Sequence, residues 1–186
     1  MRNKHTGIVW QTLTALALIL ADRLVKMFIL NSYEPGEFFG EIPYVADFIF
    51  VKNTGAAFSI LSNNTGLLSA ISVIFVIAIL AYRFIKKPQG FFLNLSLVLF
   101  FSGALGNGID RIMYKFVVDF ISIKWFNFPV FNIADVAIVS GAIALFIHIL
   151  FFDESKEKRQ WKKRIMNCCR FFRPKIFQSI WVFPLH

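Results

Sequence analysis

The chain has 186 residues, 57% of them hydrophobic and only 17% charged, and its mean hydropathy is +0.63. A single core of this size cannot bury so much apolar surface from water, so the composition excludes an ordinary soluble domain and indicates a protein that lies in lipid. The formal net charge of +9 does not indicate nucleic-acid binding, because nine of the 20 Lys and Arg residues are concentrated after Phe152.

Four apolar segments approach or exceed the roughly 20 residues that a helix needs to cross a bilayer. The first of them is not a cleavable signal peptide, because it is long and contains Asp22, Arg23 and Lys26. The sequence therefore predicts an all-α membrane protein with four transmembrane helices. The predicted spans are residues 8–30, 66–84, 91–109 and 131–152.

The distribution of charge predicts the orientation of these spans. Basic residues precede the first span, separate the second from the third and follow the fourth, whereas the connection at 31–65 holds four acids against Lys52 alone. Lys and Arg gather on the cytoplasmic side of short loops. We therefore expect both termini in the cytoplasm, with the connections 31–65 and 110–132 facing outward.

The two outward connections are expected to differ in structure. Residues 31–65 are rich in β-branched and aromatic side chains, which predicts one or two strands broken by a turn at residues 53–55. Residues 110–132 mix polar and aromatic side chains and are predicted to form a loop.

The chain is divided into a membrane domain, residues 1–152, and a basic tail, residues 153–186. The tail is expected to be cytoplasmic and to lie on anionic lipid headgroups. Cys168 and Cys169 are adjacent in it, which favours reduced thiols over a disulfide, and two ligands are too few for a metal site. The sequence assigns no role to the tail.

Ionisable residues interrupt the first span. Asp22 and Lys26 are four residues apart, share a helix face and can pair. We favour a buried ion pair that fixes helix packing over the wall of a polar pocket. Arg23 is expected to point elsewhere and to extend to the membrane interface.

The third span ends in a polar cluster. Gly103 and Gly106 allow a neighbouring helix to approach closely. Asn107, Asp110 and Arg111 follow at spacings of three and four, which places them on one broad face. A helix cap with an interfacial anchor is the simplest interpretation, but the density of polar groups fits it poorly.

Two further acids are expected near the outer surface. Asp119 is expected in the second outward connection, and Asp135 at the outer start of the fourth helix, three residues after Asn132. Each has a simple interpretation, as a loop acid and as an acid at a helix N-terminus. Both, however, are flanked by apolar residues on each side, which is unusual for surface acids.

If these two carboxylates meet in a low-dielectric site, they cannot easily both ionise, and one keeps a proton near neutral pH. The pair then supplies an acid and a base for hydrolysis of an amide without a metal or other cofactor. The predicted topology places His5, His148 and His186 on the inner side, which argues against metal hydrolysis and a serine triad at the outer face.

Five motifs in chain order resemble those of one family, the lipoprotein signal peptidases or signal peptidase II. They are DRLVK at 22–26, NTGAAFS at 53–59, GALGNGIDR at 103–111, VVDFI at 117–121 and FNIADVAI at 131–138. Gly108 departs from the pattern, since the family more often has an aliphatic residue there, and we expect it to loosen the end of the third helix.

The resemblance implies an intramembrane aspartyl endopeptidase of the bacterial inner membrane, with its active site near the outer face. Such an enzyme removes signal peptides from diacylglyceryl-modified prolipoproteins by cleaving just before the lipidated cysteine, and it binds membrane lipids and globomycin-type inhibitors. The implied fold adds a small extracytoplasmic β-cradle and a short outer helix. The implied catalytic residues are Asp119 and Asp135; the implied substrate-binding residues are Asn53, Gly55, Asn107, Arg111 and Asn132; and the implied structural polar residues are Asp22, Lys26 and Asp110.

Two other classes of protein remain open from the residues alone. The first is a proton-coupled membrane carrier or channel subunit, because intramembrane acids often mark proton paths. Carriers usually hold such acids near the midplane and contain inverted repeats, and neither feature is visible here. The second is a non-catalytic scaffold whose acids only form ion pairs.

Overall fold

A computed structural model describes residues 4–55, 64–125 and 128–152 of the chain. The basic tail, with Cys168 and Cys169, lies outside the described residues, as do Ala56 and Ala57 of the second motif. The chain divides into two compact units, Met1–His148 and Ile149–His186. Among the described residues, the first unit contains the three strands and four α-helices.

The four α-helices are α1 (Lys4–Ser32), α2 (Thr65–Lys86), α3 (Phe91–Tyr114) and α4 (Ile133–Ile147). A π-helical turn spans His148–Phe152. Within the part of the chain that the structure describes, three helical segments are long and apolar enough to cross a membrane: Thr65–Lys86, Phe91–Tyr114 and Ile133–Phe152. A span by α1 therefore stays a prediction.

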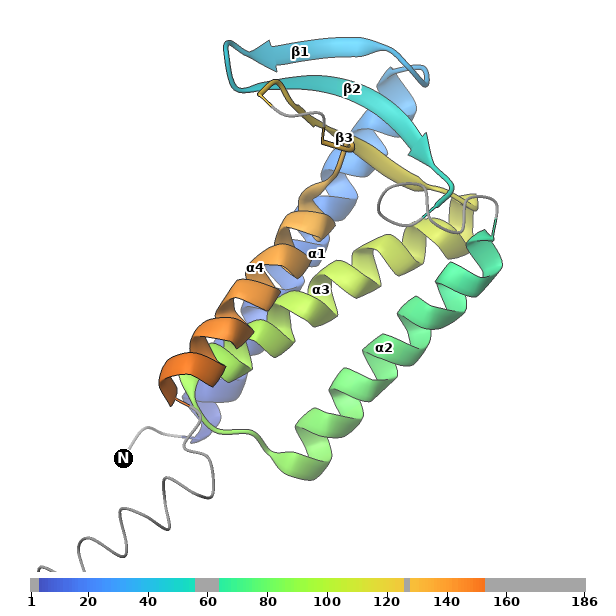
Figure 1. Ribbon diagram of the computed structural model, residues 1–186. Coiled ribbons are helices and arrows are strands. Elements are labelled where there is room, and N and C mark those ends of the chain that lie inside the picture. Colours follow the sequence, from blue (N-terminus) through green and yellow to red (C-terminus); the bar gives the residue numbers. More distant parts are fainter. Residues whose placement is uncertain (1–3, 56–63, 126–127, 153–186) are drawn as a thin grey trace, which may run out of the picture. The chain divides into compact units, whose positions relative to one another are not determined.

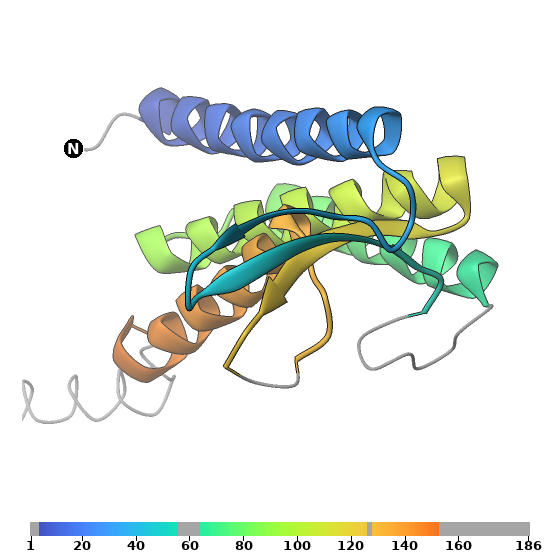
Figure 2. The ribbon, with the colours of Figure 1, turned by 90° about the horizontal axis from the view of Figure 1, so that it is seen from above.

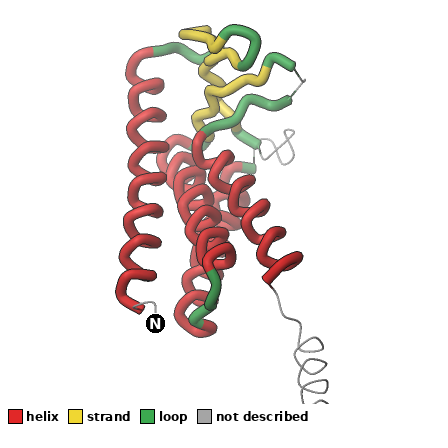
Figure 3. The backbone as a smooth tube through the Cα atoms, turned by 90° about the vertical axis from the view of Figure 1, so that its left-hand side faces the viewer, coloured by secondary structure: helices red, strands yellow, loops and turns green. Residues whose placement is uncertain are grey.

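Helix α3 lies at the centre of the bundle and contacts each of the other three helices (Figure 1). In the most apolar 18 residues of α3, 50% are buried by protein. The corresponding value for α2 is 11%, because among the described elements α2 packs mainly against α3. Helix α1 runs along the whole length of the bundle (Figure 3). The predicted close approach at Gly103 is confirmed, since a Cβ there would collide with the backbone of Ala134 and with Ile138 of α4.

A three-stranded antiparallel sheet covers one end of the bundle (Figure 2). Its strands are β1 (Phe38–Ile42), β2 (Ala46–Asn53) and β3 (Val117–Ile123), in that order. The prediction of strands in residues 31–65 is confirmed, and β2 ends at Asn53, where the predicted turn begins. Residues 56–63, in which a strand after that turn would lie, are outside the described residues. The turn that joins β1 to β2 was not predicted; it lies at residues 43–45, where Pro43 lacks a backbone N–H and Tyr44 has a positive φ of 61°.

The prediction that residues 110–132 form a loop is wrong. Helix α3 continues to Tyr114, because its charged residues find buried partners there, and Lys115 then ends it in the left-handed conformation with φ 65°. Strand β3 follows, so Asp119 lies in a strand opposite Val51 of β2. A strand was not evident from the sequence because VVDFISI lacks the strict alternation of apolar and polar residues that marks a half-buried strand.

A small apolar core lies between the sheet and α1. It is formed by Ile29, Phe50, Val118 and Phe120, all at most 5% exposed. Because successive side chains of a strand point to opposite faces, placing Val118 and Phe120 in this core turns Asp119 to the other face of β3. No short outer helix occurs among residues 4–55, 64–125 and 128–152, so that element stays a prediction.

Candidate active site

The polar residues singled out from the sequence gather at the end of the bundle that the sheet covers. They come from separate elements and are joined by side-chain hydrogen bonds. Lys26 belongs to α1, Asn53 to β2, Asn107 to α3, Asp119 to β3 and Asp135 to α4.

Asn132 forms the start of α4 and fixes the position of Asp135. Its extended backbone places the side-chain Oδ1 where it accepts a hydrogen bond from the Asp135 N–H at 2.9 Å. In return, Asp135 Oδ2 accepts from the Asn132 N–H at 3.2 Å, which completes a capping box. Asp135 therefore is a helix-start acid, but Oδ1 of its carboxylate remains for another partner.

The two acids are connected through asparagine side chains. Asn132 Nδ2 donates to Asp119 Oδ1 at 2.7 Å, so this one residue contacts both Asp119 and Asp135. Asn53 Nδ2 donates to Asp119 Oδ2 at 2.7 Å, and Asn107 Nδ2 donates to Asp135 Oδ1 at 2.7 Å. The structure thus brings both acids into one cluster in which each carboxylate oxygen receives an N–H.

The environment of Asp119 favours its protonated form. Burial first, and then the nearby negative charge of Asp135, raise the pKa of its carboxyl group to about 7. Hydrogen bonds from Asn53 and Asn132 and the positive charge of Lys26 oppose this rise, since they stabilise the carboxylate. Asp119 is only 1% exposed, so water screens these influences little.

A buried ion network lies beneath the two acids. Lys26 Nζ lies 2.9 Å from Asp22 Oδ2, which is the expected pair, and 2.9 Å from Asp110 Oδ2. All three residues are at most 2% exposed. Two carboxylates and two cations, with Arg23 as the second cation, balance to no net charge, as buried charges generally require.

The expectation that Arg23 extends to the membrane interface is wrong. Its guanidinium forms an ion pair with Asp110 and lies 3.6 Å from Asp22 Oδ2, and its side chain is only 15% exposed. Asp110 is completely buried, so the second cation is drawn inward to compensate it rather than outward to water.

Asn53 also connects Asp119 to the chain that follows β2. Its Oδ1 accepts from the Gly55 N–H at 2.9 Å, and the Gly55 carbonyl accepts from Arg111 Nη2 at 3.2 Å. The Nε of Arg111 is buried and has no hydrogen-bond partner within the described part of the chain, so this guanidinium retains donor capacity. Arg111, Gly55 and Asn53 together form one side of the cluster.

Two backbone contacts of the buried acids had no signal in the sequence. Asp110 Oδ2 accepts from the Val118 N–H at 3.3 Å, and Asp22 Oδ1 accepts from the Ala134 N–H at 3.1 Å. These bonds attach β3 and the first turn of α4 to the ion network. Because Asp119 directly follows Val118 and Asp135 directly follows Ala134, the network positions both acids of the pair.

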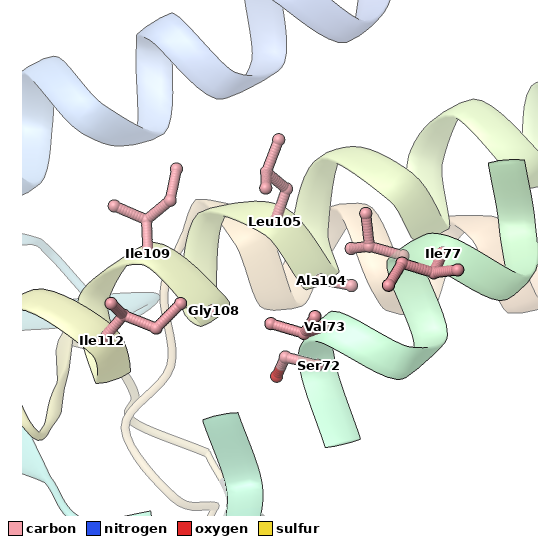
Figure 4. A pocket seen from close by; sticks show the side chains of 9 residues that line it. Ser72, Val73, Ile77, Ala104, Leu105, Gly108, Ile109 and Ile112 are labelled. Atoms are coloured by element: carbon pink, nitrogen blue, oxygen red, sulfur yellow. The ribbon is translucent and has the colours of Figure 1, made fainter. Parts of the chain in front are cut away.

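An apolar groove of about 180 Å³ lies between α2 and α3 (Figure 4). Its lining includes Ile77, Leu105 and Ile112 but none of the polar residues of the cluster, and the Ser72 hydroxyl is satisfied by the Leu68 carbonyl at 3.0 Å. A Cβ on Gly108 would lie 3.2 Å from the Ser72 Cβ, so Gly108 permits α2 to pack closely here. The groove contributes no chemistry to the candidate site.

The chain is similar to known proteins over most of its length. The family described as signal peptidase (SPase) II matches residues 14–151. The chain belongs to the signal peptidase II family. Lipoprotein signal peptidases from Moorella thermoacetica and Clostridium acetobutylicum are 42% and 38% identical to it, over 72% and 75% of this chain and 87% and 92% of theirs. The Staphylococcus aureus lipoprotein signal peptidase is 37% identical over 81% of this chain and 93% of its own.

Two solved structures of bacterial membrane enzymes share the fold. One has a TM-score of 0.74 at 31% identity and covers 80% of this chain and 93% of its own. The other has a TM-score of 0.71 at 33% identity and covers 78% and 95%. The chain is therefore a signal peptidase, a hydrolase of the protease class and a multi-pass bacterial membrane protein. The carrier or channel interpretation receives no support.

Proposed function

We propose that this signal peptidase is an aspartic endopeptidase in which Asp119 and Asp135 are the catalytic dyad. It acts on diacylglyceryl-modified prolipoproteins and cleaves just before the lipidated cysteine. The observation that carries the proposal is the contact of Asn132 with both acids, which holds the two carboxylates in one cluster.

The dyad supplies an acid and a base at the same time. Because its pKa is raised to about 7, Asp119 can hold a proton near neutral pH and donate it to the scissile carbonyl. Asp135, which accepts two N–H groups, is the base that removes a proton from the attacking water. When the C–N bond breaks, Asp135 returns its proton to the departing amine and Asp119 recovers one from the hydroxyl of the intermediate.

Substrate binding is assigned to the neutral and cationic groups around the dyad. Asparagine amides can pair with peptide backbone without adding a charge that would disturb the shared proton. Arg111 has donor capacity to spare, and Gly55 gives the chain room beside it. The assigned residues are Asn53, Gly55, Asn107, Arg111 and Asn132, with Asp22, Lys26 and Asp110 as polar support. The globomycin-type peptides implied by the family resemblance are assigned to the same cluster.

We also propose that α1 is a fourth span, with both termini cytoplasmic and the sheet and dyad near the outer face. Its 29 residues extend about 44 Å, more than the roughly 30 Å of the hydrocarbon core. Leu13, Leu16 and Leu20 of α1 are each more than half exposed, which suits contact with lipid tails. A dyad at the lipid headgroups reaches a bond beside a lipid-anchored cysteine while water remains available.

The test is cleavage of a diacylglyceryl prolipoprotein peptide by purified Asp119→Asn and Asp135→Asn variants. Each substitution removes one proton carrier, and we expect kcat to fall by about a thousandfold or more, while membrane insertion is retained. The matched control is Glu41→Gln, an exposed acid of β1 that should keep full activity. Near-normal processing by either dyad variant contradicts the assignment of the catalytic residues. Equal cleavage of the peptide with and without its diacylglyceryl group contradicts the proposed specificity.

A further inference from the structure

Lys26 is completely buried, and its ammonium group has three close acceptors. Nζ lies 2.9 Å from Asp22 Oδ2, 2.9 Å from Asp110 Oδ2 and 3.0 Å from Asn107 Oδ1. The contact with Asn107 Oδ1 is a hydrogen bond that Nζ donates, and the contacts with the two carboxylates are ion pairs. An ammonium has donors and no acceptor, so the atom of Asn107 that faces it must be the amide oxygen. Charge balance accounts for the two carboxylates but not for the third contact, with the neutral amide of Asn107.

The contacts of Asn107 admit one orientation of its amide. Its Oδ1 accepts from Lys26 and, at 3.0 Å, from Asn132 Nδ2, while its Nδ2 donates to Asp135 Oδ1. Reversing the amide would direct its N–H groups at the Lys26 ammonium and at the side-chain N–H groups of Asn132. It would also direct the amide oxygen at the Asp135 carboxylate. Each attractive contact would become a repulsive one in a site where Asn107 is only 4% exposed.

We propose that Lys26 is a positioning residue for the peptidase reaction, which acts through Asn107 to keep an N–H donor on Asp135. This inference rests on the proposed function, because it takes Asp135 as the base. With the donor in place, Asp135 is held ionised and can accept a proton from water. With the amide reversed, Asp135 must itself be protonated to satisfy the amide oxygen, and the proton of the dyad is then held by the wrong residue.

The test compares two double variants of the full chain, Asp22→Asn/Lys26→Met and Asp22→Asn/Lys26→Gln. Each removes one acid and one cation, so Arg23 and Asp110 still balance each other. The two new side chains have similar length and no charge, but only Gln retains an N–H donor for Asn107. Asp22→Asn alone is the reference, because its side-chain oxygen can still accept from the Ala134 N–H.

Relative to Asp22→Asn, we expect kcat of Asp22→Asn/Lys26→Met to fall about 100-fold, while KM changes less than about threefold. We expect kcat of Asp22→Asn/Lys26→Gln to be about tenfold higher than that of the Met variant. The pH dependence of kcat should also change in the Met variant, because the proton is relocated within the dyad. A purely structural role for Lys26 would lower the amount of folded enzyme without separating Met from Gln or moving the pH profile.

Equal kcat values for the Met and Gln variants overturn the proposal, whether both are low or both equal the kcat of Asp22→Asn. Failure of both double variants to insert while Asp22→Asn folds also overturns it, because Lys26 would then serve stability alone. These results are distinct from failure of the proposed function, which is judged by whether Asp119→Asn and Asp135→Asn retain cleavage.

Discussion

Replacing Asn53 by Ala perturbs Asp119, the acid of the proposed dyad, without changing either carboxyl group. Asn53 Nδ2 donates to Asp119 Oδ2 at 2.7 Å. An N–H donor stabilises the charged carboxylate, so this hydrogen bond holds the pKa of Asp119 below the value that burial alone would give it. Removing the donor must therefore raise the pKa of Asp119.

The size of the shift follows from the strength of the bond. A hydrogen bond to a charged group contributes about 1.5–3 kcal/mol, and water that enters the truncated site recovers part of it. A remaining loss of about 1.4 kcal/mol corresponds to about one pKa unit, which moves Asp119 from about 7 to about 8.

The assay is the pH profile of kcat/KM for a lipidated prolipoprotein peptide. With Asp119 as the proposed acid, activity of the wild-type enzyme should fall as pH rises above about 7, where the proton is lost. In Asn53→Ala this alkaline limb should move upward by about one pH unit. Asn53→Asp is the companion variant: it can still accept from the Gly55 N–H, but it places a second negative charge against Asp119 and should move the limb further in the same direction.

An alkaline limb that stays in place in both variants, or moves downward, would refute the reasoning. The first result would mean that Asp119 is not the group whose deprotonation ends activity. The second would mean that Asn53 contacts the protonated rather than the charged form of the acid.

Two further predictions concern the stability of the bundle. Asp110→Asn should lower the free energy of unfolding by about 3–5 kcal/mol, since Asp110 is completely buried and its loss leaves the positive charges of Arg23 and Lys26 undercompensated. Thermal unfolding in detergent measures this change, with the exposed Glu41→Gln as control. Equal unfolding midpoints for the two variants would contradict the role of the ion network. Gly103→Ala should cost about 1–3 kcal/mol, because its Cβ would overlap the Ala134 carbonyl of α4. Gly7→Ala in α1 is its matched control, since nothing lies within 4 Å of that added Cβ and the exchange should be neutral or stabilising; a stabilising effect in both would show that α3 and α4 are not closely packed at Gly103.

The sequence by itself determined the features that depend on local composition and spacing. Three long apolar runs appear as helices long and apolar enough to span a membrane, because hydropathy over about 20 residues reports directly on the solvent that a helix prefers. Asp22 and Lys26 pair as their spacing of four requires, and Gly103 marks a close helix contact. The five ordered motifs indicate the family without any knowledge of tertiary contacts.

Only the tertiary structure decided how these residues meet. Arg23 turns inward, β3 forms from an apparent loop and Asn132 reaches both acids, and each outcome depends on partners far away in the sequence. Asp110 attracts Arg23 across 87 positions and Lys26 bonds Asn107 across 81. No local pattern encodes such pairs, because buried charges and amides take the orientation that satisfies all their neighbours together, and those neighbours are fixed only when the helices and the sheet have packed.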